Sequence, residues 1–307
     1  MSIVNEILAE INQVVKGKED VVQKVLAAML AEGHILLEDI PGVGKTTLAM
    51  TVAKTMSMEY RRTQFTPDVL PSDILGFSMY NSQTKEFEYK AGSVFCNLFL
   101  ADEINRTSPK TQSALLEVME EGNVTVDGVT RKLPVPFTVI ATENPIGSAG
   151  TQMLPESQLD RFMVCLSMGY PSHENAIEIL KGNASKPLSH VKAVVSQEEF
   201  CRLQQQVTEL YVQELMYGYI TTLVEKTRES EYITLGASPR GSIALLRMAK
   251  AMAFINGREF VSPEDVKAVF VDTLGHRVKL STKAKAAGMD TTAVLMQIFN
   301  SVEAPRT

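Results

Sequence analysis

Residues 34–47 read HILLEDIPGVGKTT, and this stretch decides the fold. His34–Leu37 is short and apolar, as is typical of a buried strand, and the helical pattern TLAMTVAKTM follows the glycines at 47–56. A glycine-rich loop between a strand and a helix lets consecutive backbone N–H groups point at phosphate oxygens. The N-terminus of the helix adds the positive end of its dipole. The stretch therefore predicts a phosphate-binding loop (P-loop) at the start of a βαβ unit.

Each position of this loop has an expected contact with a nucleoside triphosphate. Lys45 is expected to reach the β- and γ-phosphates, and the Thr46 hydroxyl is expected to coordinate Mg²⁺. The general pattern GxxxxGK[ST] requires glycine where this chain has Asp39, so that carboxylate has to point away from the phosphates. A glycine turn that only packs against its neighbours is the alternative. The loop residues expected to bind the nucleotide are Pro41, Gly42, Val43, Gly44, Lys45, Thr46 and Thr47.

A second motif consists of the apolar run LFLA at 98–101 followed by Asp102 and Glu103. This is the Walker B pattern, in which Asp102 would hold Mg²⁺ through its waters. Glu103 would accept a proton from the water that attacks the γ-phosphate, or orient that water. Paired acids at the end of a strand also occur in helix-capping turns, and the preceding P-loop favours the catalytic interpretation.

Asn144 ends a third predicted strand, VIATEN, at 139–144. A neutral amide beside the γ-phosphate can donate a hydrogen bond to the attacking water without adding charge. An asparagine before a proline is also common in turns, so this residue alone is a weak signal.

The remaining pattern predicts an α/β domain at 1–170 and an all-α domain at 171–307. In the first part we expect a helix at 19–32, a strand near 61–65, a helix from Ser108 to Gly122, and a hairpin around Asp127-Gly128. After residue 170 we expect no strand, and helix starts are indicated at Ser172, Ser196, Ser238 and Ser262.

Composition excludes several classes of protein. The 307 residues carry 30 Lys or Arg and 36 Asp or Glu, and residues 1–170 alone have a net charge of −7, from 14 and 21. This balance argues against a protein that coats nucleic acid, which requires a basic face. Three separated cysteines predict neither disulfides nor zinc. No signal peptide or apolar run of about 18 residues is evident, so we expect no membrane insertion and a cytoplasmic location.

Five blocks occur in a fixed order along the chain: LLEDIPGVGKTTLA, LADEINRTSPKTQSALLEVMEEG, ATENP, LPESQLDRF and GASPRGSIALLR. With them the chain, from about residue 10 to its C-terminus, resembles a MoxR-type AAA+ ATPase. The resemblance implies a P-loop AAA+ core, with a parallel sheet flanked by helices, followed by a smaller all-α lid domain. It also implies a helix-2 insert at about 77–96 and a pre-sensor-1 hairpin at about 123–134.

The resemblance assigns further residues to the site. It places Val15 and Gly17 beside the adenine, makes Asn144 sensor 1, and makes Arg161 of LDRF an arginine finger that acts on ATP held by the neighbouring subunit. Arg240 of SPRG matches sensor 2. With Lys45 and Glu103, Asn144 and Arg161 complete the expected catalytic set.

The residues themselves leave alternatives for both arginines. Arg240 falls in the first turn of a helix, where a cation opposes the helix dipole unless an anion binds there. It could also be a solvated surface arginine. Arg161 follows Asp160 and could form a local ion pair, and Arg106 could contact a phosphate, a neighbouring subunit or an acid.

The resemblance implies a Mg²⁺-dependent ATP hydrolase that forms a homo-oligomeric ring, a hexamer in this family. Its expected work is chaperone-like remodelling or maturation of protein complexes, with a von Willebrand factor A domain protein as partner. One alternative is a DNA-acting AAA+ motor, for which Arg131-Lys132 on the hairpin is the only basic pair. A magnesium-chelatase motor subunit is another. A sigma-54 activator would need a GAFTGA loop, which this sequence lacks. A scaffold without ATP turnover would not need both Glu103 and Asn144, so their presence argues against that alternative.

Overall fold

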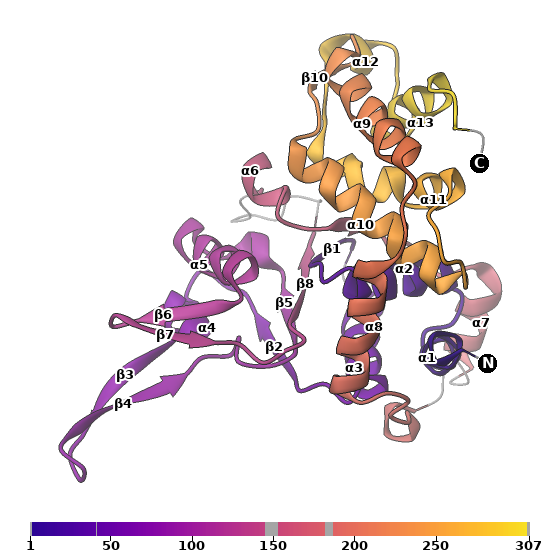
Figure 1. Cartoon of the computed structure of the whole chain (residues 1–307). Coiled ribbons are helices and arrows are strands. Elements are labelled where there is room, and N and C mark those ends of the chain that lie inside the picture. The colour runs from indigo at the N-terminus through magenta and orange to yellow at the C-terminus, as the bar shows by residue number, and fades with distance from the viewer. Residues whose placement is uncertain (1, 41, 145–152, 182–186, 306–307) are drawn as a thin grey trace. The chain divides into compact units, whose positions relative to one another are not determined.

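The computed structural model describes residues 2–40, 42–144, 153–181 and 187–305, which form two compact units (Figure 1). Unit 1 consists of Met1–Val22, His34–Leu154 and Ser167–Cys201, and unit 2 of Gln23–Gly33, Pro155–Leu166 and Arg202–Thr307. Two short segments of the predicted α/β domain at 1–170 thus group with the C-terminal part of the chain. The domain boundary at residue 170 stays a prediction.

Unit 1 contains the predicted strand, glycine loop and helix in that order. Its helices are α1 (Ile3–Asn12), α3 (Lys45–Thr55), α4 (Pro71–Leu75), α5 (Pro109–Glu121), α7 (His173–Leu180) and the start of α8 (Gln197–Glu209). Its strands are β1 (Ile35–Glu38), β2 (Tyr60–Gln64), β3 (Gly76–Asn81), β4 (Glu86–Ala91), β5 (Leu98–Asp102), β6 (Asn123–Val126), β7 (Val129–Lys132) and β8 (Thr138–Glu143). The helix expected from Ser108 is α5: the Ser108 side chain caps its first turn, and Gly122 ends it in the left-handed conformation.

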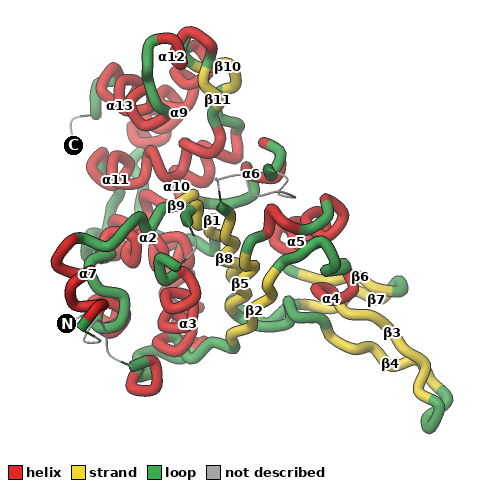
Figure 2. Tube along the Cα trace, turned by 180° about the vertical axis from the view of Figure 1, so that it is seen from behind, coloured by secondary structure: helices red, strands yellow, loops and turns green. Residues whose placement is uncertain are grey.

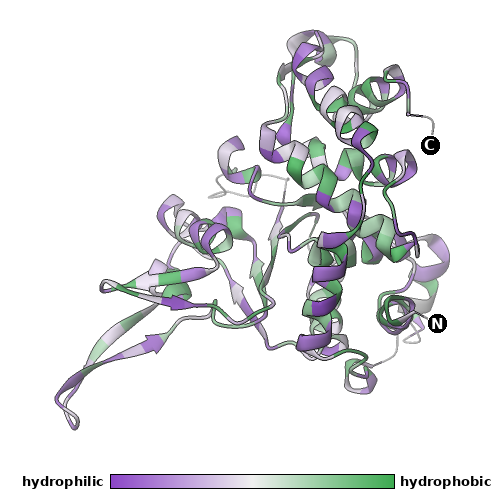
Figure 3. Cartoon of the chain, in the orientation of Figure 1, coloured by the Kyte–Doolittle hydropathy of each residue, from purple (hydrophilic) through white to green (hydrophobic). Residues whose placement is uncertain are grey.

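The central sheet has five strands in the order β2-β5-β8-β1-β9, where β9 is Val164–Leu166. The pairs β2–β5, β5–β8 and β1–β8 are parallel. Every residue of β5 and β8 is buried, and both strands have an apolar middle, at Leu98–Ala101 and Val139–Ala141. Figure 3 colours the chain by hydropathy, with apolar residues in green. In a parallel sheet the carboxyl ends of the strands lie along one edge, so the residues that follow β1, β5 and β8 come together there. The α/β core predicted from the sequence is confirmed.

Two hairpins, β3–β4 and β6–β7, project from unit 1 side by side (Figures 1 and 2). They occupy the segments expected for the insert and for the Asp127-Gly128 hairpin. Asp127 and Gly128 have φ of +53° and +75°, the left-handed conformations that a tight two-residue turn requires. The Arg131 guanidinium of β7 lies 3.7 Å from the centroid of the Tyr89 ring of β4, so a cation–π contact joins the hairpins.

Unit 2 is mostly helical. Its elements are α2 (Glu19–Leu30), whose first turn belongs to unit 1, α6 (Glu156–Leu159), β9, the remainder of α8, α9 (Glu214–Glu229), β10 (Ile233–Leu235), α10 (Pro239–Ile255), α11 (Pro263–Leu274), β11 (Lys279–Leu280), α12 (Thr282–Ala286) and α13 (Thr291–Ser301). The helix starts at Ser196, Ser238 and Ser262 are confirmed. The expectation of no strand after residue 170 is wrong, because β10 and β11 pair as an antiparallel ribbon. Strands of three and two residues are too short to show a sequence period.

Within the described ranges, no helix is both long enough and apolar enough to cross a membrane.

Candidate nucleotide-binding and catalytic site

The glycine loop joins β1 to α3. Gly42 and Gly44 have φ of +87° and +95°, and Gly44 is the N-cap of α3, so Lys45 and Thr46 are its first two residues. The first N–H groups of a helix have no partner within the helix, so this end of the loop is suited to binding an anion. Lys45 Nζ donates to the backbone oxygen of Asp39 at 2.8 Å. Pro41 lies outside the described residues.

Burial lowers the pKa of Lys45, and the carboxylates of Asp39, Asp102, Glu103 and Glu143 oppose that shift. Four acidic side chains thus act on one cation. Two of these acids also pair with arginines, Asp102 with Arg62 and Glu103 with Arg106.

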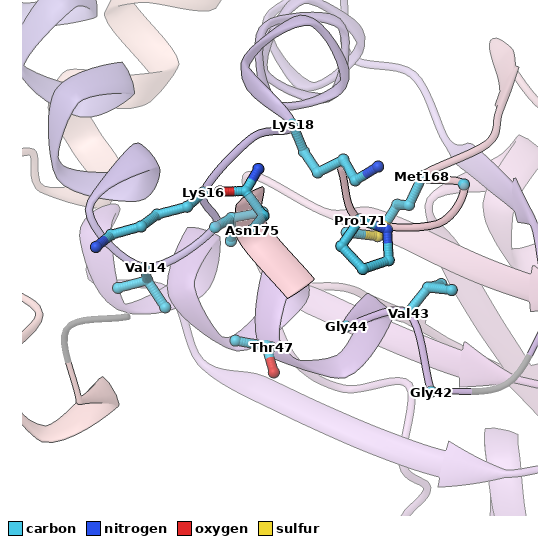
Figure 4. A pocket seen from close by; sticks show the side chains of 12 residues that line it. Val14, Lys16, Lys18, Gly42, Val43, Gly44, Thr47, Met168, Pro171 and Asn175 are labelled. Atoms are coloured by element: carbon cyan, nitrogen blue, oxygen red, sulfur yellow. The ribbon is translucent and has the colours of Figure 1, made fainter. Parts of the chain in front are cut away.

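A cavity of about 220 Å³ lies beside the loop (Figure 4). Three segments of unit 1 supply its walls: residues 14–18 after α1, residues 42–47 of the loop and α3, and residues 168–175 leading into α7. Gly17, at φ +71°, packs so tightly that a Cβ atom would lie 1.9 Å from Asn175 Nδ2. Val15, two residues before Gly17, is buried and lines the cavity. Of the two residues that the family resemblance places beside adenine, Val15 lines the cavity and Gly17 packs against Asn175, which also lines it.

Asp39 is directed at the backbone of one cavity wall. Its carboxylate accepts hydrogen bonds from Ser167 Oγ at 2.9 Å, from the Gly169 N–H at 3.1 Å and from the Met168 N–H. Three donors offset the cost of burying the charge, and they hold the segment 167–169 against the loop. The departure from the general P-loop pattern thus has a structural role in forming the pocket.

Asp102 and Glu103 end β5 within a hydrogen-bond network. Asp102 Oδ2 accepts from Arg62 Nη2 at 2.6 Å, and Asp102 Oδ1 accepts from Thr142 Oγ1 at 2.7 Å. Glu103 has φ +57°, and its Oε2 accepts from Arg106 Nη1 at 2.7 Å and Gln64 Nε2 at 2.9 Å. Arg106 therefore pairs with an acid, one of the alternatives left open by the sequence.

Sequence reasoning missed three of these partners, namely Arg62, Gln64 and Thr142. Arg62 and Gln64 lie on β2 and Thr142 lies on β8, the two strands that flank β5. Gln64 pairs in register with Asp102. A signal existed in principle, because polar residues near the carboxyl ends of buried strands gather at the edge where the acids lie.

Asn144 follows β8 and is half-buried, and its backbone oxygen accepts from Asn105 Nδ2 at 3.2 Å. The residue before it, Glu143, was also missed by sequence reasoning. Glu143 is 3% exposed and pairs in register with Glu38, and its Oε2 has no hydrogen-bond partner among the described residues. Burial, followed by the charge of Glu38, raises the pKa of Glu143 to about 7.

The oxygen atoms of Thr46 and Asp102 suit Mg²⁺, which prefers hydroxyl and carboxylate ligands. No group of three or more His, Cys, Asp or Glu side chains in the described part of the chain could hold a metal by itself. Magnesium commonly takes one or two protein oxygens and completes its shell with water and phosphate. The residues present fit an ion that arrives with the nucleotide.

Arg161 and Arg240 belong to unit 2, whereas the other candidates belong to unit 1. Arg161 is half-buried just after α6, and Arg240 is the exposed second residue of α10. The placement of Arg240 in the first turn of a helix is confirmed.

Comparison with known proteins identifies the family. The family model described as "ATPase family associated with various cellular activities (AAA)" matches residues 34–164, and that of the AAA lid domain matches 225–298. The protein YeaC of Bacillus subtilis is 48% identical over 296 residues, covering 96% of this chain and 92% of YeaC. Chaperone MoxR1 of Mycobacterium tuberculosis is 37% identical over 306 residues, covering 97% of this chain and 81% of MoxR1. The chain belongs to the MoxR family of AAA+ ATPases.

A solved structure supports the same assignment for the whole chain. The crystal structure of "a putative ATPase" from Cytophaga hutchinsonii is 39% identical and covers 99% of this chain and 95% of its own, with a TM-score of 0.91. The chain thus consists of an AAA core followed by a helical lid, and it is an ATPase.

Proposed function

We propose that this MoxR-family ATPase hydrolyses Mg²⁺-ATP as a ring of identical subunits, six by family resemblance, and uses the energy to remodel or mature protein complexes. The observation that carries the proposal is the meeting of a P-loop, an acid pair and Asn144 at the ends of neighbouring strands. This arrangement brings together phosphate binding, metal binding and water activation.

Each residue has a role in this proposal. The helix N-terminus and Lys45 bind the β- and γ-phosphates, while Thr46 and Asp102 hold Mg²⁺, which neutralises charge on the phosphates when bound. Glu103 accepts the proton of the attacking water, and Asn144 orients that water. The cavity beside Val15 and Gly17 receives the adenine.

Two observations favour a protein client over DNA. Arg131, the hairpin cation that a DNA-acting motor would use, stacks on Tyr89 and donates to the backbone oxygen of Val129 at 3.1 Å. Its charge is therefore engaged in hairpin packing. The relative MoxR1 is named a chaperone. A partner with a von Willebrand factor A domain is proposed on family resemblance, and a magnesium-chelatase-like role differs mainly in its partner.

Replacing the carboxylate proposed to activate water tests the chemistry. Glu103→Gln keeps the size of the side chain, so we expect ATP to bind while turnover falls by roughly 10³-fold or more. Glu117→Gln on the exposed face of α5 is the matched control and should leave turnover unchanged. Retained turnover in Glu103→Gln would remove Glu103 from the mechanism, and turnover that survives Mg²⁺ chelation would contradict the metal assignment.

Mixing two inactive variants tests the ring and Arg161 together. Arg161→Ala should bind ATP but hydrolyse it roughly 10³–10⁵ times more slowly, the usual effect of losing an arginine finger. When the two kinds of subunit exchange, some Arg161→Ala subunits come to lie beside a Glu103→Gln neighbour. The ATP site between them is complete, because the first subunit supplies Glu103 and its neighbour supplies Arg161. Random equal mixing restores about a quarter of the interfaces. An inactive mixture, with exchange confirmed by fluorescently labelled subunits, would rule out a site shared between subunits.

A further inference from the structure

We propose that Asp160 is a positioning residue that links Arg161 to Arg240 within unit 2. Arg161 is the arginine that one subunit offers to its neighbour, and Arg240 is the sensor 2 arginine of the same subunit. Through this link, the position of Arg161 depends on the position of α10, the helix that carries Arg240. The inference rests on the role proposed above for Arg161 and on the family resemblance that makes Arg240 sensor 2, an arginine that contacts the nucleotide, and it adds the structural connection between them.

The two carboxylate oxygens of Asp160 have different partners. Oδ1 accepts from Arg277 Nε at 2.9 Å, and Oδ2 accepts from Ser238 Oγ at 2.8 Å. The side chain of Arg277 is 2% exposed and that of Asp160 is 17% exposed, so water competes little for these bonds. Hydrogen bonds to a charged group in such surroundings are short and directional. Asp160 therefore connects two elements that are distant in the sequence.

Arg277 fixes the backbone on both sides of Arg161. Its Nη2 donates to the backbone oxygens of Asp160, at 3.1 Å, and of Phe162, and its Nη1 donates to that of Met163 at 3.1 Å. His276 Nε2 also lies 3.1 Å from the Phe162 oxygen. A planar guanidinium with several partners allows little displacement. The main chain that carries Arg161 is thus attached to the end of α11.

Ser238 makes the second connection. It is the N-cap residue of α10, but its side chain makes no capping hydrogen bond with that helix. In contrast, the side chain of Ser281 accepts from the Ala284 N–H at 3.3 Å and caps α12 in the usual way. The Ser238 hydroxyl donates instead to Asp160, the residue before Arg161, and Arg240 follows two residues after Ser238.

The hydrogen bond from Ser238 to Asp160 connects the start of α10 to the segment that carries Arg161. An anion bound by Arg240 pulls on the first turn of α10, and the bond from Ser238 to Asp160 passes that displacement to the segment of Arg161. A contiguous set of contacts can carry coupling of this kind, and Asp160, Ser238 and Arg277 form such a set. The nucleotide state of one subunit therefore adjusts the finger that it presents to the next.

Mixed rings separate the two ends of this link. In the mixture described above, the Glu103→Gln chain only donates Arg161, and the Arg161→Ala chain only hydrolyses ATP. Adding Ser238→Ala to the donor chain should lower the rescued rate by about tenfold to a hundredfold, the effect of a small misplacement of a catalytic group. Adding it to the hydrolysing chain should change mainly the KM for ATP, because that chain has no Arg161.

Three further donor chains provide two controls and a second test. Ser238→Thr keeps a hydroxyl and should restore the rescued rate. Ser281→Ala removes the N-cap hydroxyl of another helix of unit 2 and should leave the rescued rate unchanged. Asp160→Asn is a second test and not a control: it weakens the ion pair with Arg277, so it should lower the rescued rate. This variant keeps the proposal testable if Ser238→Ala folds poorly. Thermal unfolding of each variant, with and without ATP, reports folding independently of activity.

The outcomes are distinguishable. If the mixture without link variants is inactive, the shared site of the proposed function fails, and this proposal falls with it. If that mixture is active and Ser238→Ala and Asp160→Asn donors rescue as well as the unmodified donor, only the link is overturned. An equal loss of kcat with the variant in either chain would show a general structural defect and would also overturn the link.

Discussion

Lys45 shows how single residues prepare this site for a triphosphate. Its ammonium donates to the Asp39 backbone oxygen, and several carboxylates surround it. We expect Lys45→Ala to abolish ATP binding, because the phosphates lose the P-loop cation placed to contact them. Binding of a fluorescent ATP analogue measures this, and Lys110→Ala on α5 is the control. Wild-type affinity in Lys45→Ala would contradict the assignment.

Glu143 predicts a dependence of stability on pH. Its pKa is raised from 4.5 to about 7 in the folded protein. Between these values the folded chain keeps a proton that the unfolded chain releases, so this group's contribution is fully present below pH 4.5 and is lost as the pH rises through 7. The loss amounts to about 3 kcal/mol at most.

The variant Glu143→Gln is neutral at every pH. We expect its free energy of unfolding to match the wild type near pH 4 and to exceed it by about 1–3 kcal/mol at pH 8. Urea unfolding at both pH values measures the difference, with Glu117→Gln as the control. A variant that is equally stable or less stable at pH 8 would show that Glu143 is not buried as a neutral acid.

At the scale of elements, the two hairpins depend on each other. Neither two-stranded ribbon is expected to be stable alone, and the contact of Arg131 with Tyr89 joins them. We expect Arg131→Ala to increase hydrogen exchange in β4 by about two- to fivefold, corresponding to about 0.5–1 kcal/mol, without affecting ATP binding. Lys132→Ala is the matched control. Unchanged exchange in β4 would show that the contact does not support the hairpin.

The turn of the second hairpin should differ from the core of the sheet. Asp127-Gly128 forms an exposed tip, whereas β5 is completely buried. We expect amide exchange at the tip to be much faster than at Phe99–Asp102, because local opening there breaks few contacts. Equal protection at both places would contradict a mobile tip.

At the scale of the whole molecule, net charge and hairpin packing favour a protein client. If the proposed ring acts on a protein client, Glu103→Gln in ATP should hold it in the client-bound state, and affinity capture should then retain protein and no duplex DNA at physiological salt. The chain carries a net charge of −6, which opposes binding to a phosphate backbone. Retention of DNA that falls steeply with salt would support the DNA-acting alternative.

The sequence by itself determined the glycine loop between a strand and a helix, the buried strand that ends in acids, and most helix starts, whereas the AAA+ fold followed from the family resemblance. These features depend on residues close together in the chain: glycines between a strand and a helix, acids after an apolar run, and serines before helices. Local conformational preferences act over such distances, so one sequence is enough to recognise them. The short ribbon β10–β11 escaped prediction because its strands carry too few residues to show a pattern.

Only the tertiary structure decided which side chains surround these motifs. Arg62 reaches Asp102 across 40 positions, Ser238 reaches Asp160 across 78, and Arg277 reaches Asp160 across 117. The raised pKa of Glu143 depends likewise on burial and on Glu38 in a neighbouring strand. Strand order and register bring Arg62 to Asp102 and Glu38 to Glu143, and packing within unit 2 brings Ser238 and Arg277 to Asp160. None of these contacts is encoded in the spacing of one motif. Because charge, burial and hydrogen bonding depend on these distant neighbours, the chemistry of the site became visible only in the folded chain.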